Sequence, residues 1–131
     1  MSLLLDTHIL LWAVSDAARL TEDTRARLDD PAETLVFSAA SLWEIAIKSA
    51  LGRDDFRVDG ARLRAACLAA GYLELPVTGL HALGVADLPP IHRDPFDRIL
   101  VAQARAERLP LLTADSAVAA YGTPVESVRL A

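Results

Sequence analysis

The sequence has little cysteine and no long apolar run. Its single cysteine, Cys67, excludes an internal disulfide, and its alanine and leucine neighbours predict a small buried thiol rather than a reactive one. The first residues lack the basic start of a signal peptide, and Asp6 soon interrupts their apolar run. No stretch approaches the ~18 consecutive apolar residues that a membrane helix needs. We therefore expect a cytoplasmic protein that does not enter the membrane.

Positive charge is also scarce. Lysine and arginine total 13 against 18 acids, the formal net charge is −5, and Lys48 is the single lysine. This balance excludes a protein that holds nucleic acid by bulk electrostatics alone. For a polyanionic ligand, bound cations or local arginines must offset the acids.

Apolar residues are abundant, at 53% of 131 residues, and predict one domain spanning residues 1–131. Short apolar runs alternate with segments of helical periodicity. Strands are expected at residues 3–5, 35–37, 73–75, 111–112 and 125–128, and helices at 9–14, 42–47, 63–70 and 95–108. This alternation is typical of an α/β fold, a Rossmann-like parallel sheet with helices on both faces. Ligands bind such sheets at the carboxyl ends of the strands.

Four acids lie near expected strand ends or helix starts: Asp6, Glu44, Asp97 and Asp115. Convergent carboxylates repel one another, and a hard divalent cation relieves that repulsion. A zinc site is not expected, because the three histidines are dispersed and a second cysteine is absent. Acids of this kind indicate phosphate chemistry on Mg²⁺ or Mn²⁺.

Each acid also has a structural interpretation. Ser41 and Glu44 have capping-box spacing, Asp94 precedes Pro95 as an N-cap does, and Asp115 can cap a helix at 117–119. Taken singly, Glu44, Asp94 and Asp115 are predicted to be caps. For Asp6, at the end of a buried strand, the functional interpretation is favoured over capping the next helix.

The remaining polar residues are less informative. His81 is expected to be structural, and His92 to be an exposed loop residue. Arg93 and Arg98 flank the acids of the 94–97 segment and could meet phosphate, although surface arginines usually have no specific role.

Four motifs occur in order along the chain: LLDTH (4–8), SAASLWEIAIK (38–48), HRDPFDR (92–98) and LTAD (112–115). Together they resemble the PIN-domain toxins of the VapC type. The resemblance implies a Mg²⁺- or Mn²⁺-dependent endoribonuclease that leaves 5′-phosphate products. It also implies an RNA substrate, a small antitoxin partner and a homodimer.

By position, the resemblance makes Asp6 and Asp97 the metal ligands, completed by Glu44 directly or through water. It makes Asp115 a more peripheral catalytic acid. The supporting polar residues that it implies are Thr7, Ser38, Asp94 and Thr113, with Asp94 interpreted first as a cap.

Two alternatives stay open: a PIN-like RNA-processing nuclease without a toxin role, and an interaction module whose acids are all caps. For an antitoxin, an inserted arginine could neutralise the acids, and apolar positions Leu42, Trp43 and Ile47 could form a groove. Core packing is the expected use of most of these three.

Overall fold

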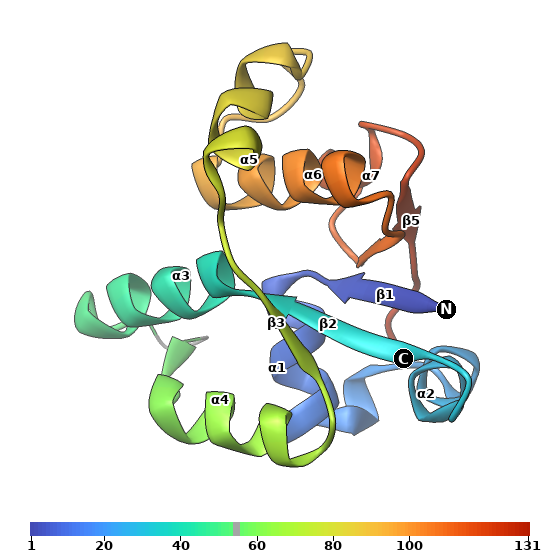
Figure 1. Cartoon of the computed structure of the whole chain (residues 1–131). Helices are drawn as coiled ribbons and strands as arrows, with labels where there is room; N and C mark the ends of the chain where they lie inside the picture. The colour runs from blue at the N-terminus through green and yellow to red at the C-terminus, as the bar shows by residue number, and fades with distance from the viewer. Residues whose placement is uncertain (54–55) are drawn as a thin grey trace.

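The computed structural model describes residues 1–53 and 56–131, which form a five-stranded sheet between layers of helices (Figure 1). The strands are β1 (Ser2–Leu5), β2 (Thr34–Ser38), β3 (Leu73–Leu75), β4 (Leu111–Thr113) and β5 (Val125–Ser127). The helices are α1 (Thr7–Ser15), α2 (Glu22–Asp29), α3 (Ala39–Ala50), α4 (Gly60–Ala69), α5 (Gly79–Gly84), α6 (Pro95–Glu107) and α7 (Ser116–Ala119). Short 3₁₀ helices lie at Ala17–Arg19 and Val85–Asp87. The predicted α/β class is confirmed.

The pairings within the sheet are all parallel, in the order β3-β2-β1-β4-β5. In the centre, Leu4 of β1 pairs with Val36 of β2 on one side and Leu111 of β4 on the other. The chain extends outward from β1 through β2 and β3, whereas β4 and β5 extend the opposite side. The strand order therefore reverses between β1 and β4, and ligands of open α/β sheets bind at such a point.

The leucines of β1 show why an unbroken apolar run suits this strand. Leu3 and Leu5 pack in one core cluster and Leu4 in the other, and all three are fully buried. Helices α1 and α4 cover the first face, and α6 and α7 cover the second (Figure 1). A parallel strand buried on both faces requires this pattern.

Cys67 lies on α4 within the first core cluster. Burial raises the pKa of its thiol to about 11, which disfavours the reactive thiolate. The predicted buried role of this cysteine is confirmed. Within the described part of the chain, none of the helices has the length and apolar character needed to cross a bilayer.

Candidate active site

Asp6 lies at the carboxyl end of β1, beside the point where the strand order reverses. It is 5% exposed, and its two oxygens have different partners. Oδ1 accepts a hydrogen bond from the Ile9 amide at 2.8 Å and so caps α1, whereas Oδ2 accepts from the Thr113 hydroxyl at the end of β4. The cap role that the sequence pattern disfavoured for Asp6 is therefore present, but it occupies one carboxylate oxygen.

Glu44 is buried in α3, and its predicted role in a capping box is wrong. The helix begins at Ala39, because the Ser38 hydroxyl accepts from the Ala40 amide at 3.0 Å, and Ser41 lies inside the helix. The Glu44 side chain is instead held by a distant residue, since Thr7 Oγ1 donates to Glu44 Oε1 at 2.6 Å. Its burial and its long-range partner connect α3 to the start of α1.

Lys48 is a site residue whose role the sequence motifs did not predict. Its Nζ lies 2.6 Å from Glu44 Oε2 and 3.9 Å from Asp94 Oδ2. The ammonium also lies 4.8 Å from the Phe56 ring centroid and 5.7 Å from that of Phe96, and the lysine side chain is 16% exposed. The i,i+4 spacing of Glu44 and Lys48 was the available sequence signal.

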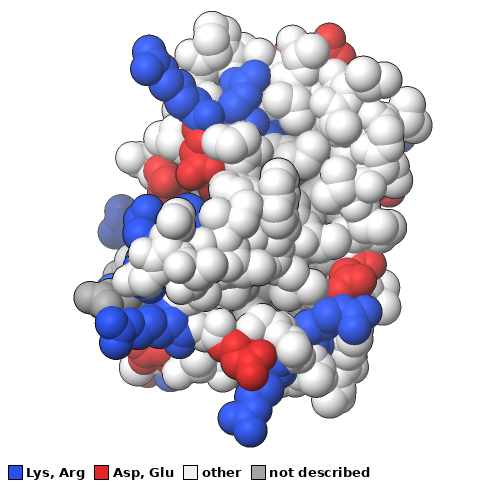
Figure 2. Space-filling model, turned by 90° about the vertical axis from the view of Figure 1, so that its left-hand side faces the viewer, with Lys and Arg blue, Asp and Glu red and all other residues white. Residues whose placement is uncertain are grey.

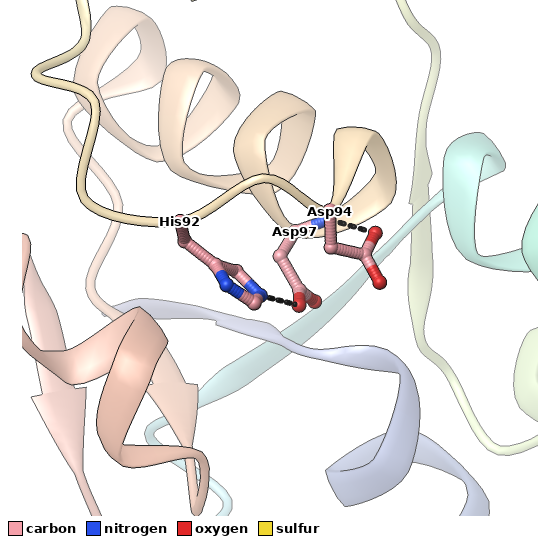
Figure 3. Close-up of side chains that lie close together, drawn as sticks. All are labelled: His92, Asp94 and Asp97. Carbon is pink, nitrogen blue, oxygen red and sulfur yellow. Dashed lines mark hydrogen bonds and ion pairs between the residues drawn. The ribbon is translucent and has the colours of Figure 1, made fainter.

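Asp94 and Asp97 have different hydrogen-bond partners at the start of α6. Asp94 Oδ1 accepts from the amides of Phe96 at 2.8 Å and Asp97 at 3.3 Å, so its predicted N-cap role is confirmed. Asp97 is instead bonded to His92, whose Nε2 lies 2.8 Å from Asp97 Oδ2. Figure 3 shows His92 approaching Asp97 from the segment before the helix, whereas Asp94 turns toward the helix start.

His92 is thus not the exposed loop residue that was expected, because its side chain is 24% exposed and contacts an acid of the site. The local sequence gave no signal for this contact, which depends on the path of an irregular segment. His81, by contrast, has the predicted structural role. It is buried, forms a capping box with Thr78 and lies 2.9 Å from Glu107 through Nε2.

Asp115 is the most exposed of the four acids. It caps α7 by accepting from the Ala117 amide at 2.8 Å, so its predicted cap role is confirmed. Thr113 joins it to Asp6, because the threonine hydroxyl donates to Asp6 and accepts from the Asp115 amide at 3.0 Å. Asp6 and Asp115 also line one cavity of about 270 Å³.

Burial and mutual repulsion raise the pKa values of the central acids. Burial is the main cause for Asp6, whose pKa rises to about 6, and the charge of Asp97 adds to the rise. The pKa of Asp97 is also raised, first by burial and then by the charges of Asp94 and Glu44, while the hydrogen bond from His92 opposes the rise. The site therefore places close carboxylates where their negative charges are disfavoured.

These residues fit a hard divalent cation. Among the described residues, neither Asp6 nor Asp97 forms an ion pair with lysine or arginine, and the partner of Asp97 is the imidazole of His92. His92, Asp94 and Asp97 each place a ligand atom within 4.8 Å of the others, whereas Asp6, Glu44 and Asp115 are outside this group. Carboxylate oxygens are ligands that Mg²⁺ and Mn²⁺ prefer, and a cation would relieve the repulsion.

Two apolar residues beside the site are not in the core, contrary to expectation. Trp43 is 61% exposed and Ile47 37%, whereas Leu42 packs against the first core cluster as expected. The Trp43 ring contacts Phe96 edge to face, with centroids 5.0 Å apart. Trp43 also lines a groove of about 530 Å³ together with Arg93, which is exposed.

The sequence pattern of the PIN domain matches residues 3–123, and the chain therefore belongs to the PIN domain family. Among proteins with curated descriptions, none matches this chain. Solved structures share its fold at low sequence identity. A chain of the VapBC2 complex of Rickettsia felis, bound to a DNA fragment from its promoter, has a TM-score of 0.68 at 13% identity, with 100% of both chains covered.

A chain of VapBC-1 from nontypeable Haemophilus influenzae has a TM-score of 0.67 at 18% identity, covering 98% of each chain. The sarcin-ricin loop cleaving toxin VapC20 of Mycobacterium tuberculosis has a TM-score of 0.61 at 19% identity. The alignment with VapC20 covers 92% of this chain and 95% of that one. These similarities establish that the fold is that of VapC toxins.

Proposed function

We propose that this chain is a metal-dependent endoribonuclease and the toxin of a toxin–antitoxin pair, with residues 1–131 acting as one nuclease domain in the cytoplasm. One observation carries the proposal. Three acids, Asp6, Glu44 and Asp97, lie at the carboxyl ends of the strands. Neither aspartate forms an ion pair with lysine or arginine within the described residues. Membership of the PIN domain family and the fold shared with a sarcin-ricin loop cleaving toxin support the same function.

Asp6 and Asp97 are the proposed ligands of Mg²⁺ or Mn²⁺, with Glu44 holding the ion directly or through water and Asp115 more peripheral. When bound, the cation supplies positive charge to the phosphodiester and lowers the pKa of water, which makes hydrolysis accessible at neutral pH. The chain has a net negative charge and would not attract RNA by its overall electrostatics. The bound cation would supply positive charge at the site itself.

The chain's own residues fix the acids for that chemistry. The Thr113 hydroxyl orients Asp6, the Thr7 hydroxyl orients Glu44, and His92 Nε2 holds one oxygen of Asp97. Ser38 starts α3 at the register that directs Glu44 inward. Lys48 forms an ion pair with Glu44 at 2.6 Å, and this pair offsets part of the cost of burying the carboxylate. The proposed products carry a 5′-phosphate.

The proposed partner is a small antitoxin that covers this edge of the sheet. Its inserted arginine would neutralise the carboxylates in place of the metal. Trp43 and Ile47 are exposed on α3, the helix that carries Glu44, and would receive its apolar side chains. The chain shares its fold with chains of VapBC complexes, which supports a partner of this kind.

A second copy of the chain is the other proposed partner. The face that carries α3 and α5 has a broad uncharged area with charged residues at its margins (Figure 2). On α5, Leu80 is 79% exposed and Leu83 is 75% exposed, which is unusual for large apolar side chains on a monomer. Serine at both positions should convert a homodimer into a folded monomer, as measured by light scattering and circular dichroism.

An RNA cleavage assay tests the nuclease proposal. Purified protein should cleave RNA with Mg²⁺ or Mn²⁺ and stop when EDTA is added, and Asp6→Asn, prepared identically, should be inactive. Cleavage that persists in EDTA, or in Asp6→Asn, would overturn the proposal. A folded protein that leaves RNA intact would favour the interaction module whose acids are caps.

Expression in cells tests the toxin role separately. The wild-type chain should arrest growth when expressed alone, and co-expression of the adjacent small gene should restore growth and yield a complex with little RNase activity. Metal-dependent cleavage in vitro without growth arrest would instead favour an RNA-processing nuclease.

A further inference from the structure

Arg98 holds together the irregular segment that precedes α6. Residues 88–94 form neither helix nor strand, and Arg98 follows them on α6. Its Nη1 donates to the carbonyls of Pro89 and His92, both at 3.2 Å, and its Nη2 donates to the carbonyl of Val85 at 3.1 Å. One guanidinium on α6 is thus hydrogen-bonded to three backbone carbonyls of the preceding chain. The planar, five-donor geometry of arginine suits this use, which a lysine ammonium could not reproduce.

Tyr121 completes the arrangement from the far side of the segment. Its side chain is buried, and its hydroxyl accepts from Arg98 Nη1 at 3.0 Å and from the His92 amide at 3.2 Å. The same hydroxyl donates to the His92 carbonyl at 3.4 Å. Both polar groups of the His92 backbone are therefore bonded to one tyrosine oxygen. These hydrogen bonds fix the position of the His92 backbone, and therefore the point from which the imidazole side chain extends.

The imidazole in turn holds Asp97, since His92 Nε2 and Asp97 Oδ2 are 2.8 Å apart. A carboxylate in the first turn of a helix can adopt several rotamers, and a ligand must keep one of them. Arg98 and Tyr121 are thus hydrogen-bonded to the His92 backbone, and the His92 side chain is hydrogen-bonded to this oxygen.

We propose that Arg98 and Tyr121 are positioning residues that act through His92 to hold the Asp97 carboxylate in its metal-binding orientation. The inference rests on the proposed function, because it takes Asp97 to be a ligand of the cation. A role confined to stability would tie the segment down without affecting Asp97. The two roles differ in whether the effect on metal binding passes through the His92 side chain.

A double-mutant cycle on Mn²⁺ affinity tests this difference. Tyr121→Phe removes the hydroxyl and keeps the ring in its core cluster, His92→Asn removes the imidazole, and calorimetry gives the Mn²⁺ affinity of each variant and of the double variant. Loss of a group that orients a metal ligand weakens metal binding about tenfold or more. We expect Tyr121→Phe to weaken binding about tenfold in the wild-type background and to have little further effect in the His92→Asn background.

A readout on the metal-free protein separates this inference from the proposed function. Amide hydrogen exchange at His92 should become faster in Tyr121→Phe and in Arg98→Lys, and Arg98→Lys should also weaken Mn²⁺ binding. The matched control is Arg105→Lys, an exposed arginine on the same helix, which should change neither quantity.

Unchanged Mn²⁺ affinity in Tyr121→Phe, or equal weakening with and without the imidazole, would overturn the positioning role while leaving the nuclease proposal intact. Wild-type protein that binds no Mn²⁺ would overturn both, even if exchange at His92 still responds to Tyr121→Phe.

Discussion

Lys48 Nζ and Glu44 Oε2 are 2.6 Å apart, so one acid of the candidate site has a fixed cation before any metal binds. The neighbouring acids Asp6 and Asp97 have no lysine or arginine partner among the described residues, and Asp97 is paired instead with the imidazole of His92. The site therefore contains one carboxylate paired with a lysine and two that lack a lysine or arginine partner. This division explains why Asp6 and Asp97, rather than Glu44, are the main proposed ligands.

The first prediction compares this ion pair with an exposed one of equal length. Lys48→Met leaves the Glu44 charge buried and unpaired, and should lower the free energy of unfolding of the metal-free protein by ~3 kcal/mol. Arg64 and Glu74 also lie 2.6 Å apart but with side chains 50% and 28% exposed, so Arg64→Met should lower the free energy of unfolding far less than Lys48→Met does. Urea denaturation in EDTA measures both. Equal losses would contradict the importance assigned to burial.

The second prediction concerns the pH dependence of the metal-free protein. Burial raises the pKa of Asp6 from 3.8 to about 6, so the folded state binds a proton more tightly than the unfolded state does. The free energy of unfolding should therefore be highest below pH 3.8, where Asp6 is protonated in both states. It should fall by up to ~3 kcal/mol as the pH rises from 3.8 to about 6. Asp6→Asn should unfold with a flatter pH profile and be more stable than wild type at pH 7 in EDTA. A wild-type profile identical to that of Asp6→Asn would contradict the assignment.

The third prediction separates the two acids at the start of α6. Asp94→Ala removes the helix cap and should destabilise the protein by ~0.5–2 kcal/mol, with activity falling less than in Asp97→Asn. Asp97→Asn should remain folded and lose nearly all activity. Thermal melting and RNA cleavage, measured on the same preparations, distinguish the two roles. Complete inactivation of a well-folded Asp94→Ala would mean that the cap is also part of the reaction centre.

The fourth prediction concerns the hydroxyl that joins β1 and β4. Thr113→Val removes the hydrogen bond that lowers the pKa of Asp6, so this pKa should rise further and Mn²⁺ binding at neutral pH should weaken. Thr113→Ser keeps the hydroxyl and should restore the affinity. Titration calorimetry at two pH values tests this, with the larger loss for valine expected at the lower pH. A serine variant as weak as the valine variant would show that the methyl group, not the bond, matters.

The fold class could be predicted because the strands carry their own signal. Three consecutive buried leucines in β1 indicate a strand covered on both faces, and Asp94-Pro95 marks the start of α6. Helix α2 was missed because its residues are mostly polar and exposed, and Thr24 is its one buried residue. Its local signal was the Thr21 cap followed by acids in the first turn.

The site was harder to predict because its partners are distant in sequence. Ser41 and Glu44 have the spacing of a capping box, yet Glu44 is bonded to Thr7, which lies 37 positions away. Local spacing cannot reveal such a contact, because it depends on how β1 and β2 pair. The same holds for His92, whose position depends on side chains that hold an irregular segment.

The central claim is that RNA cleavage depends on a cation held by Asp6 and Asp97. The most direct measurement is the cleavage rate of one defined RNA as Mn²⁺ is varied, for wild type and Asp97→Asn, beside calorimetric Mn²⁺ binding to the same samples. We expect the wild-type rate to saturate over the concentration range in which Mn²⁺ binds, and Asp97→Asn to lose both binding and cleavage while remaining folded. A wild-type rate that is independent of Mn²⁺, or full cleavage by Asp97→Asn, would contradict the claim.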